Sequence, residues 1–140
     1  MASYILRRVL QAIPITKIKR MYQEAKLTIN PLTETPYGSG HTVVLENMAL
    51  GKPVIATRVG GMIDYFEDGV SAIGYAAGDV ADLRQKIGAY LDNPAQFAHI
   101  GRQSREWVRR FSSEEFARTL LRIATSLCAN PKTAASHATH

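Results

Sequence analysis

The sequence predicts an α/β fold, in which a partial Rossmann-like parallel sheet carries flanking and trailing helices. Segments with apolar residues at helical spacing alternate with short apolar runs that end at proline or glycine. The run at residues 53–57 is apolar without alternation, which is typical of a strand covered on both faces. Strands that alternate with helices in this way are typical of doubly wound parallel sheets.

The first half of the chain predicts two helix–strand pairs. Residues 17–26 carry one apolar stripe at helical spacing, and a short strand is expected at 27–30. A loop rich in turn-forming residues follows. Thr42 is then a candidate N-cap for a second helix. The Gly-Lys-Pro sequence at 51–53 is expected to end this helix, and the strand at 53–57 follows directly.

The second half predicts one more strand and several helices. A glycine pair leads into a short helix that is expected to end near Asp68, and residues 70–75 are expected to form the third strand. Asp79 is a candidate N-cap for the next helix. Pro94 suits the first turn of another helix, and Ser-Ser-Glu-Glu at 112–115 resembles a capping box for the last one.

Length and composition are those of one globular domain. The 140 residues suffice for a single core. One cysteine, Cys128, excludes an internal disulfide and fits a reducing compartment. No apolar run approaches the roughly 20 residues that span a bilayer. A net charge of +5 permits an acidic partner, but the basic residues are scattered without a reader motif, which disfavours nucleic acid.

The pattern divides the chain into three segments. Residues 1–16 are an N-terminal segment that the pattern leaves unassigned, 17–130 form the domain, and 131–140 are expected to be a disordered tail. Arg7 and Arg8 interrupt the apolar residues of the first segment, which argues against a signal peptide. A helix docked on its own domain, a poorly folded end of a truncated chain and an amphipathic surface anchor all remain open.

The candidate site is a small-residue loop followed by a helix that carries one acid, Glu46. Backbone amides at the start of a helix are unpaired, and with the helix dipole they bind phosphate. Glu46 lies at i,i+4 from Thr42, where a carboxylate can accept bonds from both vicinal hydroxyls of a ribose. The residues expected to contact a nucleoside diphosphate are Gly38, Ser39, Gly40, His41, Thr42, Val43 and Glu46.

A purely structural role is the alternative for the same residues. Glu46 can instead pair with a basic residue such as Lys52 or Arg58, and the glycines can serve only to turn the chain. The spacing alone does not decide between the two interpretations.

Five segments resemble, in order, parts of the C-terminal donor-binding domain of retaining glycosyltransferases with the GT-B fold, family 4 or glycosyltransferase group 1. The resemblance runs from about residue 18 to 111, about two-thirds of the chain. The segments are Met-Tyr-Gln-Glu-Ala-Lys at 21–26, Leu-Glu-Asn-Met-Ala-Leu-Gly-Lys-Pro-Val-Ile-Ala-Thr at 45–57, Val-Gly-Gly at 59–61, Asp-Tyr-Phe-Glu-Asp-Gly at 64–69 and Gly-Asp at 78–79.

The resemblance implies a site for a nucleoside diphosphate sugar such as UDP-sugar or GDP-sugar. In that family an acid at the position of Glu46 holds the ribose, and the preceding loop, here residues 39–43, cradles the diphosphate and the sugar with backbone amides. The family generally uses the helix dipole and basic side chains where other glycosyltransferases use a metal. The lack of an Asp-x-Asp motif fits this, and we expect neither a cofactor nor a metal.

The sequence departs from the family pattern in two places. The family has two glutamates separated by seven residues, and the position of the first is Gly38 here. Glu34 on the same loop is a candidate substitute. Residues 1–16 do not match the early strands that carry the family's Arg and Lys for the leaving diphosphate. We therefore expect a truncated part of the domain, without the N-terminal acceptor domain.

The expected function is that of a retaining glycosyltransferase, an enzyme that moves a hexose from the donor to a carbohydrate or lipid-linked acceptor. No catalytic residue is assigned. The alternative is a module without turnover that binds nucleotide sugar or associates, with itself or another chain, through an exposed sheet edge. A nucleotide-sugar epimerase shares the two-domain fold but lacks a recognisable acid pair here.

The expected location is the cytoplasm, with contact to the inner face of the membrane left open. The residues that could contact anionic lipid are Arg102, Arg105, Arg109 and Arg110, which surround Trp107. A solvated face, with Trp107 packed on the domain, is the more ordinary interpretation of this cluster.

Overall fold

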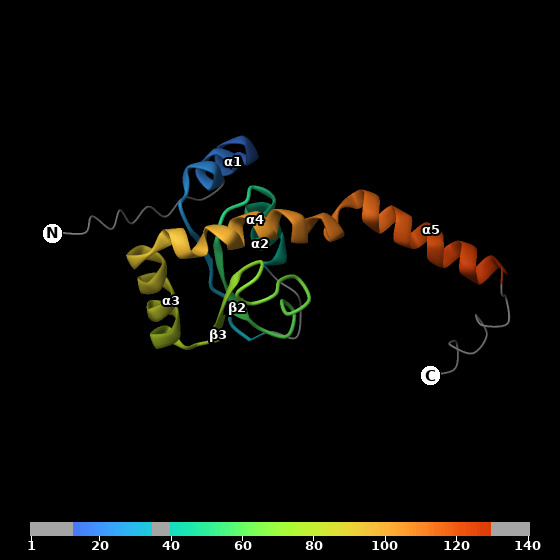
Figure 1. Ribbon diagram of the computed structural model, residues 1–140. Helices are drawn as coiled ribbons and strands as arrows, with labels where there is room; N and C mark the ends of the chain where they lie inside the picture. Colours follow the sequence, from blue (N-terminus) through green and yellow to red (C-terminus); the bar gives the residue numbers. More distant parts are fainter. Residues whose placement is uncertain (1–12, 35–39, 130–140) are drawn as a thin grey trace.

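The computed structural model describes residues 13–34 and 40–129 of the chain (Figure 1). Its elements are α1 (Ile15–Glu24), β1 (Thr28–Asn30), α2 (His41–Ala49), β2 (Val54–Arg58), β3 (Ile73–Ala76), α3 (Val80–Asp92), the 3₁₀ turn η1 (Pro94–Phe97), α4 (Ala98–Trp107), the 3₁₀ turn η2 (Val108–Phe111) and α5 (Ser113–Ala129). The expectations for residues 1–12 and for the tail lie outside the described residues.

The three strands form one parallel sheet in the order β1-β2-β3. Ile55 on the central strand pairs with Ile29 on one side and with Ile73 on the other. The central strand is almost wholly buried, in agreement with its apolar sequence. The structure thus confirms the predicted parallel α/β fold.

Helices cover both faces of this sheet. On one face, Val44 and Met48 of α2 are fully buried against Ala56 and neighbouring apolar residues. On the other face, Ile55 packs with Ile100 of α4, and α3 and η1 add partly buried side chains. Near its start, α4 packs Ile100 against one face of the sheet. At its end, Trp107 packs against the cluster on the other face, which contains the α2 side chains. Figure 1 shows α4 running past α2.

A close crossing fixes α4 against the end of α2. Gly101 lies so near the turn after α2 that a Cβ there would be 2.4 Å from the carbonyl oxygen of Gly51. Ser104 is fully buried, and its hydroxyl lies 3.5 Å from the carbonyl oxygen of Met48. Only a residue without a side chain fits at position 101.

The outer edge of β3 is occupied by two carboxylates. Asp68 accepts a hydrogen bond from the amide of Gly74 (2.6 Å), and Asp82 accepts one from the amide of Ala76 (3.0 Å). Arg58 holds both acids, at 2.8 Å and 3.8 Å. These two amides cannot pair with another strand, whereas β1 has no strand beyond it within the described ranges.

The structure corrects three local predictions. The segment after the glycine pair forms successive turns instead of a short helix, and these turns bury Met62 and Phe66 in the core. The third strand begins at Ile73, since the amides of Val70 and Ser71 both bond the carbonyl of Glu67. Of the capping box, one half is present, the bond from the Glu115 amide to the Ser112 hydroxyl; the Glu115 carboxylate instead pairs with Arg118.

Two boundary predictions are confirmed. Asp79 caps α3 by accepting a hydrogen bond from the amide of Asp82 at 2.8 Å. Pro94 lies in the first turn of a helix, although that turn is the 3₁₀ segment η1. No helix within residues 13–34 and 40–129 is both long and apolar enough to cross a bilayer.

Candidate functional site

The start of α2 lies at the carboxyl end of β1, where parallel α/β sheets bind ligands. Asn30, the last residue of β1, is buried, and its side-chain amide donates to the carbonyl of Gly40 at 3.0 Å. Gly40 precedes the helix with φ +74°, a left-handed conformation that favours glycine. A Cβ at Gly40 would also lie 2.9 Å from both Asn30 and Leu32. The strand end thereby sets the position of the helix start.

A buried hydroxyl supports this corner from the neighbouring strand. Thr57 of β2 is fully buried, donates to the carbonyl of Asn30 at 3.1 Å and accepts from the amide of Leu32 at 2.8 Å. Its oxygen also lies 2.8 Å from the hydroxyl of Tyr75 on β3. All three strands are therefore tied together beside the start of α2, which makes this edge rigid.

The first amides of α2 have no hydrogen-bond partner among the residues that the structure describes. The first intrahelical bond runs from Val44 to Gly40 at 3.3 Å, so the amides of His41, Thr42 and Val43 precede the helical ladder. Thr42 and Val43 are exposed. The predicted N-cap at Thr42 is wrong, because the helix already begins at His41 and Gly40 takes the cap position without a side-chain bond.

The remaining two loop residues of the predicted site, Gly38 and Ser39, lie outside the described residues. Glu34, the candidate substitute for the missing glutamate, is exposed on the loop after β1. Its carboxylate lies 3.4 Å from the amide of Gly60, beyond the end of β2. The structure thus places Glu34 at the same sheet edge as the start of α2.

His41 lies in an aromatic stack that the sequence did not reveal. Its ring is 5.0 Å from that of Tyr65 and nearly parallel to it, and Tyr65 in turn lies 5.3 Å from Phe111. Nδ1 of His41 is buried and has no hydrogen-bond partner within the described part of the chain. The backbone of Tyr65 is held by the indole N–H of Trp107 at 3.0 Å. No sequence spacing links residues 41, 65 and 111, so only the tertiary structure identifies them as neighbours.

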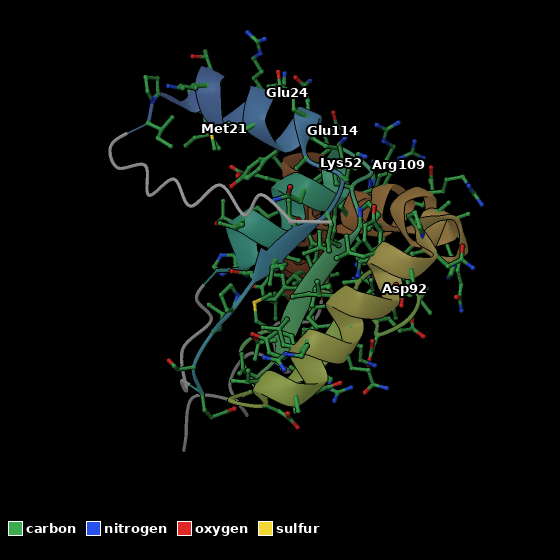
Figure 2. All side chains as sticks on the ribbon, turned by 90° about the vertical axis from the view of Figure 1, so that its left-hand side faces the viewer. Met21, Glu24, Lys52, Asp92, Arg109 and Glu114 are labelled. Carbon is green, nitrogen blue, oxygen red and sulfur yellow. The ribbon has the colours of Figure 1, made fainter. Side chains whose placement is uncertain are left out.

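Glu46 has no basic partner among the described residues. Lys52 lies beside the last turn of α1 (Figure 2) and donates to the carbonyl of Gln23 at 2.5 Å. Arg58 is held by Asp68 and Asp82. Lys52 and Arg58, the two basic residues named as partners of Glu46 in the purely structural interpretation, therefore bind other groups.

Glu46 instead borders a mostly apolar hollow between α1 and α2. The hollow has a volume of about 270 Å³ and is lined by Ile15, Ile18, Lys19, Tyr22, Glu46, Ala49 and Leu50. Burial, and secondarily the negative charge of Glu46, raise the pKa of Tyr22 above its ordinary value of 10.0. From the sequence, Tyr22 belongs only to the apolar stripe of residues 17–26, and no spacing relates it to Glu46.

The arginines of the late helix are largely used within the domain. Arg105 donates to the carbonyl of Leu50 at 3.4 Å, and Arg109 pairs with Glu106 at 2.7 Å. The guanidinium of Arg110 lies 3.6 Å from the centre of the Trp107 ring. Trp107 itself packs against the core, as the ordinary interpretation of this cluster expected.

A parallel sheet with an open helix N-terminus at its carboxyl edge defines a Rossmann-like domain of the nucleotide-binding class. Residues 5–93 match the family described as glycosyl transferases group 1, and the chain belongs to this family. The predicted resemblance is thus confirmed, and the family's members are enzymes.

Curated relatives agree with this assignment. The chain is 31% identical over 124 residues to a D-inositol 3-phosphate glycosyltransferase of Acidothermus cellulolyticus, covering 89% of this chain and 27% of that protein. It is 36% identical over 73 residues to an uncharacterised glycosyltransferase of Methanocaldococcus jannaschii, covering 52% and 21%. The chain therefore spans about a quarter of the length of these relatives.

Solved structures of GT-B glycosyltransferases share the fold. Sucrose-phosphate synthase from Thermosynechococcus elongatus superposes with a TM-score of 0.66 at 29% identity, over 78% of this chain and 27% of that one. The Anabaena protein HepE in complex with UDP and glucose superposes with a TM-score of 0.66 at 23% identity, over 77% and 29%. The domain described here has the architecture of the corresponding part of these enzymes.

Proposed function

We propose that the chain forms the donor-binding part of a retaining glycosyltransferase, which moves a hexose from a nucleoside diphosphate sugar to a carbohydrate or lipid-linked acceptor. The observation that carries this proposal is the pairing, on one short helix, of first-turn amides and a carboxylate: among the described residues the amides have no hydrogen-bond partner and the carboxylate has no basic one. Glu46 lies one turn beyond Thr42 on α2, so both can reach one extended ligand.

The diphosphate is assigned to the amides of residues 39–43. Fixed N–H dipoles at a helix start stabilise negative charge, and this charge increases on the diphosphate as the glycosidic bond breaks. This arrangement supports departure of the nucleoside diphosphate through backbone groups, and the proposal includes no metal. Glycine at position 40 adopts the left-handed conformation that starts the helix beside Asn30, and this sets the direction of the first amides.

Glu46 is assigned to the ribose of the donor. A carboxylate has acceptor capacity for both vicinal hydroxyls, and a half-buried acid that has no basic partner among the described residues gains most from such partners. The names of the relatives support the substrate class, because they include D-inositol 3-phosphate glycosyltransferases and alpha-maltose-1-phosphate synthase. The Anabaena neighbour was solved with UDP and glucose.

Calorimetric titration of the purified chain with UDP, GDP, UDP-glucose and GDP-mannose tests the proposal. We expect one base to be preferred, and Glu46→Ala to raise its Kd roughly 10- to 150-fold, the equivalent of about 1.5–3 kcal/mol for bonds to a charged group. Asp92→Ala, which removes an exposed acid at the end of α3, is the matched control, because α3 and α2 pack on opposite faces of the sheet, and it should leave the Kd unchanged.

The outcomes separate the candidate functions. Binding that Glu46→Ala does not weaken would contradict the ribose assignment. Binding without sugar transfer to any tested acceptor would favour the alternative, a nucleotide-sugar-binding module without turnover. If a folded chain, checked by circular dichroism, binds none of the four ligands, the proposed donor site is wrong for this chain.

A further inference from the structure

The aromatic stack beside the start of α2 joins the candidate site to a segment that is distant in sequence. The ring of His41, the first residue of α2, lies 5.0 Å from that of Tyr65, and the two ring planes differ by 16°. Aromatic rings at this separation attract each other beyond the effect of the area that they bury. The side chain of Tyr65 therefore constrains the first residue of the helix whose amides are assigned to the diphosphate.

Two features make the first turn of α2 depend on this stack. Gly40 takes the N-cap position, so no side-chain hydrogen bond caps the helix. Nδ1 of His41 is buried and has no hydrogen-bond partner within the described part of the chain. Asn30 holds the carbonyl of Gly40, which precedes the helix, but it does not hold the side chain of His41. The orientation of that side chain therefore depends on the ring of Tyr65.

Tyr65 can hold another residue in place because its own backbone is anchored at both of its polar groups. Its carbonyl accepts a hydrogen bond from the indole N–H of Trp107 at 3.0 Å, and its amide donates to the carbonyl of Met62 at 3.0 Å. Met62 is fully buried, and Trp107 packs against the same core cluster. Tyr65 therefore transmits the fixed position of the core to His41.

We propose that Tyr65 is a positioning residue for the donor diphosphate, and that it acts through the stacked ring of His41 to hold the first amides of α2 in their binding orientation. This inference rests on the proposed function, in which these amides bind the diphosphate. Donors that are fixed before the ligand arrives lose little conformational freedom on binding, so the affinity is higher. Loss of the stack should therefore weaken the contact with the phosphates and leave the contact with the nucleoside unchanged.

The ribose end of the proposed site does not depend on Tyr65. Glu46 lies between Val44 and Met48 along α2, and both of these residues are fully buried in the core. The middle of the helix therefore stays in place when its first turn is loosened. The amide of Val44 marks the boundary, because it forms the first bond of the helix, to the carbonyl of Gly40 at 3.3 Å. Its exchange with solvent reports on the first turn.

Two substitutions of Tyr65 test the proposal by calorimetry with UDP and uridine, or with GDP and guanosine if the chain prefers guanine. Tyr65→Leu removes the ring, and we expect the Kd of the diphosphate to rise about 3- to 10-fold while that of the nucleoside changes by less than about twofold. Tyr65→Phe keeps the ring, and its Kd for the diphosphate should lie within about twofold of that of the unchanged chain. A general loss of structure would instead raise both Kd values together.

Phe97→Leu is the matched control. Phe97 forms an aromatic pair with Tyr90, with the ring centres 5.8 Å apart, on the face of the sheet opposite α2. Its loss should lower the melting temperature and leave both Kd values unchanged. The proposal is overturned if Tyr65→Leu leaves the Kd of the diphosphate unchanged, if it raises the Kd of the nucleoside equally, or if Phe97→Leu has the same effect as Tyr65→Leu.

Hydrogen exchange of the ligand-free chain, followed by NMR, separates this inference from the proposed function. Tyr65→Leu should speed the exchange of the Val44 amide at least about threefold more than that of Ile55 in the central strand, whereas Tyr65→Phe should not. If Val44 responds in this way but the chain binds no nucleotide, the hold of Tyr65 on the helix start stands and the proposed donor site is wrong. If Val44 and Ile55 respond equally, the positioning role of Tyr65 is wrong, whatever the chain binds.

Discussion

Helices α2 and α5 obey different constraints in the same chain. α2 has nine residues, and three of them (Val44, Asn47 and Met48) are fully buried. Its start is fixed by Asn30 at the strand end, and its end is packed against α4. α5 is nearly twice as long and has no buried side chain in the described structure. The core therefore accounts for the apolar residues of α2, whereas no contact within the described residues accounts for those of α5.

Truncation of one apolar side chain in each helix gives the largest expected contrast. Met48→Ala removes a fully buried side chain between α2 and the sheet and should lower the free energy of unfolding by about 2–5 kcal/mol. Leu127→Ala on α5 should change it by less than about 0.5 kcal/mol, because no α5 side chain is buried within the described residues. Urea unfolding followed by circular dichroism measures both values. Equal losses would show that α5 belongs to the same core.

Substitutions at two helical glycines test whether the crossing with α4 fixes the end of α2. Gly101→Ala brings a Cβ against the carbonyl of Gly51 and should destabilise the domain by about 1–3 kcal/mol. Gly88→Ala in α3 is the matched control, because no atom lies within 4 Å of the added Cβ, and it should stabilise by about 0.5–1 kcal/mol. Opposite signs in thermal melting confirm that the crossing fixes α2. A neutral Gly101→Ala would contradict it.

The parts of the fold that local sequence determines were predictable. The apolar run at 53–57 revealed the buried central strand, and Asp79 revealed the start of α3, because burial on both faces and capping each leave a short-range pattern. The turns at 60–70 were not predictable. They depend on Met62 and Phe66 entering the core and on Asp68 reaching β3, which are contacts between distant parts of the chain.

In the candidate site, too, the features with a local sequence pattern were predictable and those that depend on distant contacts were not. Glycines, a helix start and Glu46 were visible as a motif. The structure places residues 40–43 at the carboxyl edge of the sheet and Glu46 one turn further along α2, beside the hollow between α1 and α2. The stacking of His41 on Tyr65 was hidden, since the 23 residues between them include most of α2 and the whole of β2. The cap at Thr42 was predicted wrongly because the strand end fixes Gly40 through Asn30, and this tertiary bond overrides the side-chain preference at the next positions.

The smallest expected effect is a change in the pKa of Tyr22, which should respond to removal of the charge of Glu46 on α2 but not to removal of the charge of Glu115 on α5. Glu115 on α5 pairs with Arg118, whereas Glu46 on α2 faces Tyr22 without a cation among the described residues. Burial and then Glu46 raise the pKa of Tyr22. Glu46→Gln should therefore lower this pKa part of the way towards 10.0, because burial, the larger cause, remains. Glu115→Gln should leave it unchanged.

The raised pKa of Tyr22 also determines whether the free energy of unfolding rises or falls at alkaline pH. Above pH 10.0 the unfolded chain releases the Tyr22 proton while the folded chain still holds it, so stability falls as the pH rises through this window. Glu46→Gln should weaken that fall, and Tyr22→Phe should remove the part due to this residue. Titration of the assigned Tyr22 ring carbon by NMR measures the pKa, and melting between pH 9 and 11 measures the stability. A Tyr22 pKa that is the same in Glu46→Gln and in the unchanged chain would show that the carboxylate points away from the hollow, and the comparison between the two acids would then lose its basis.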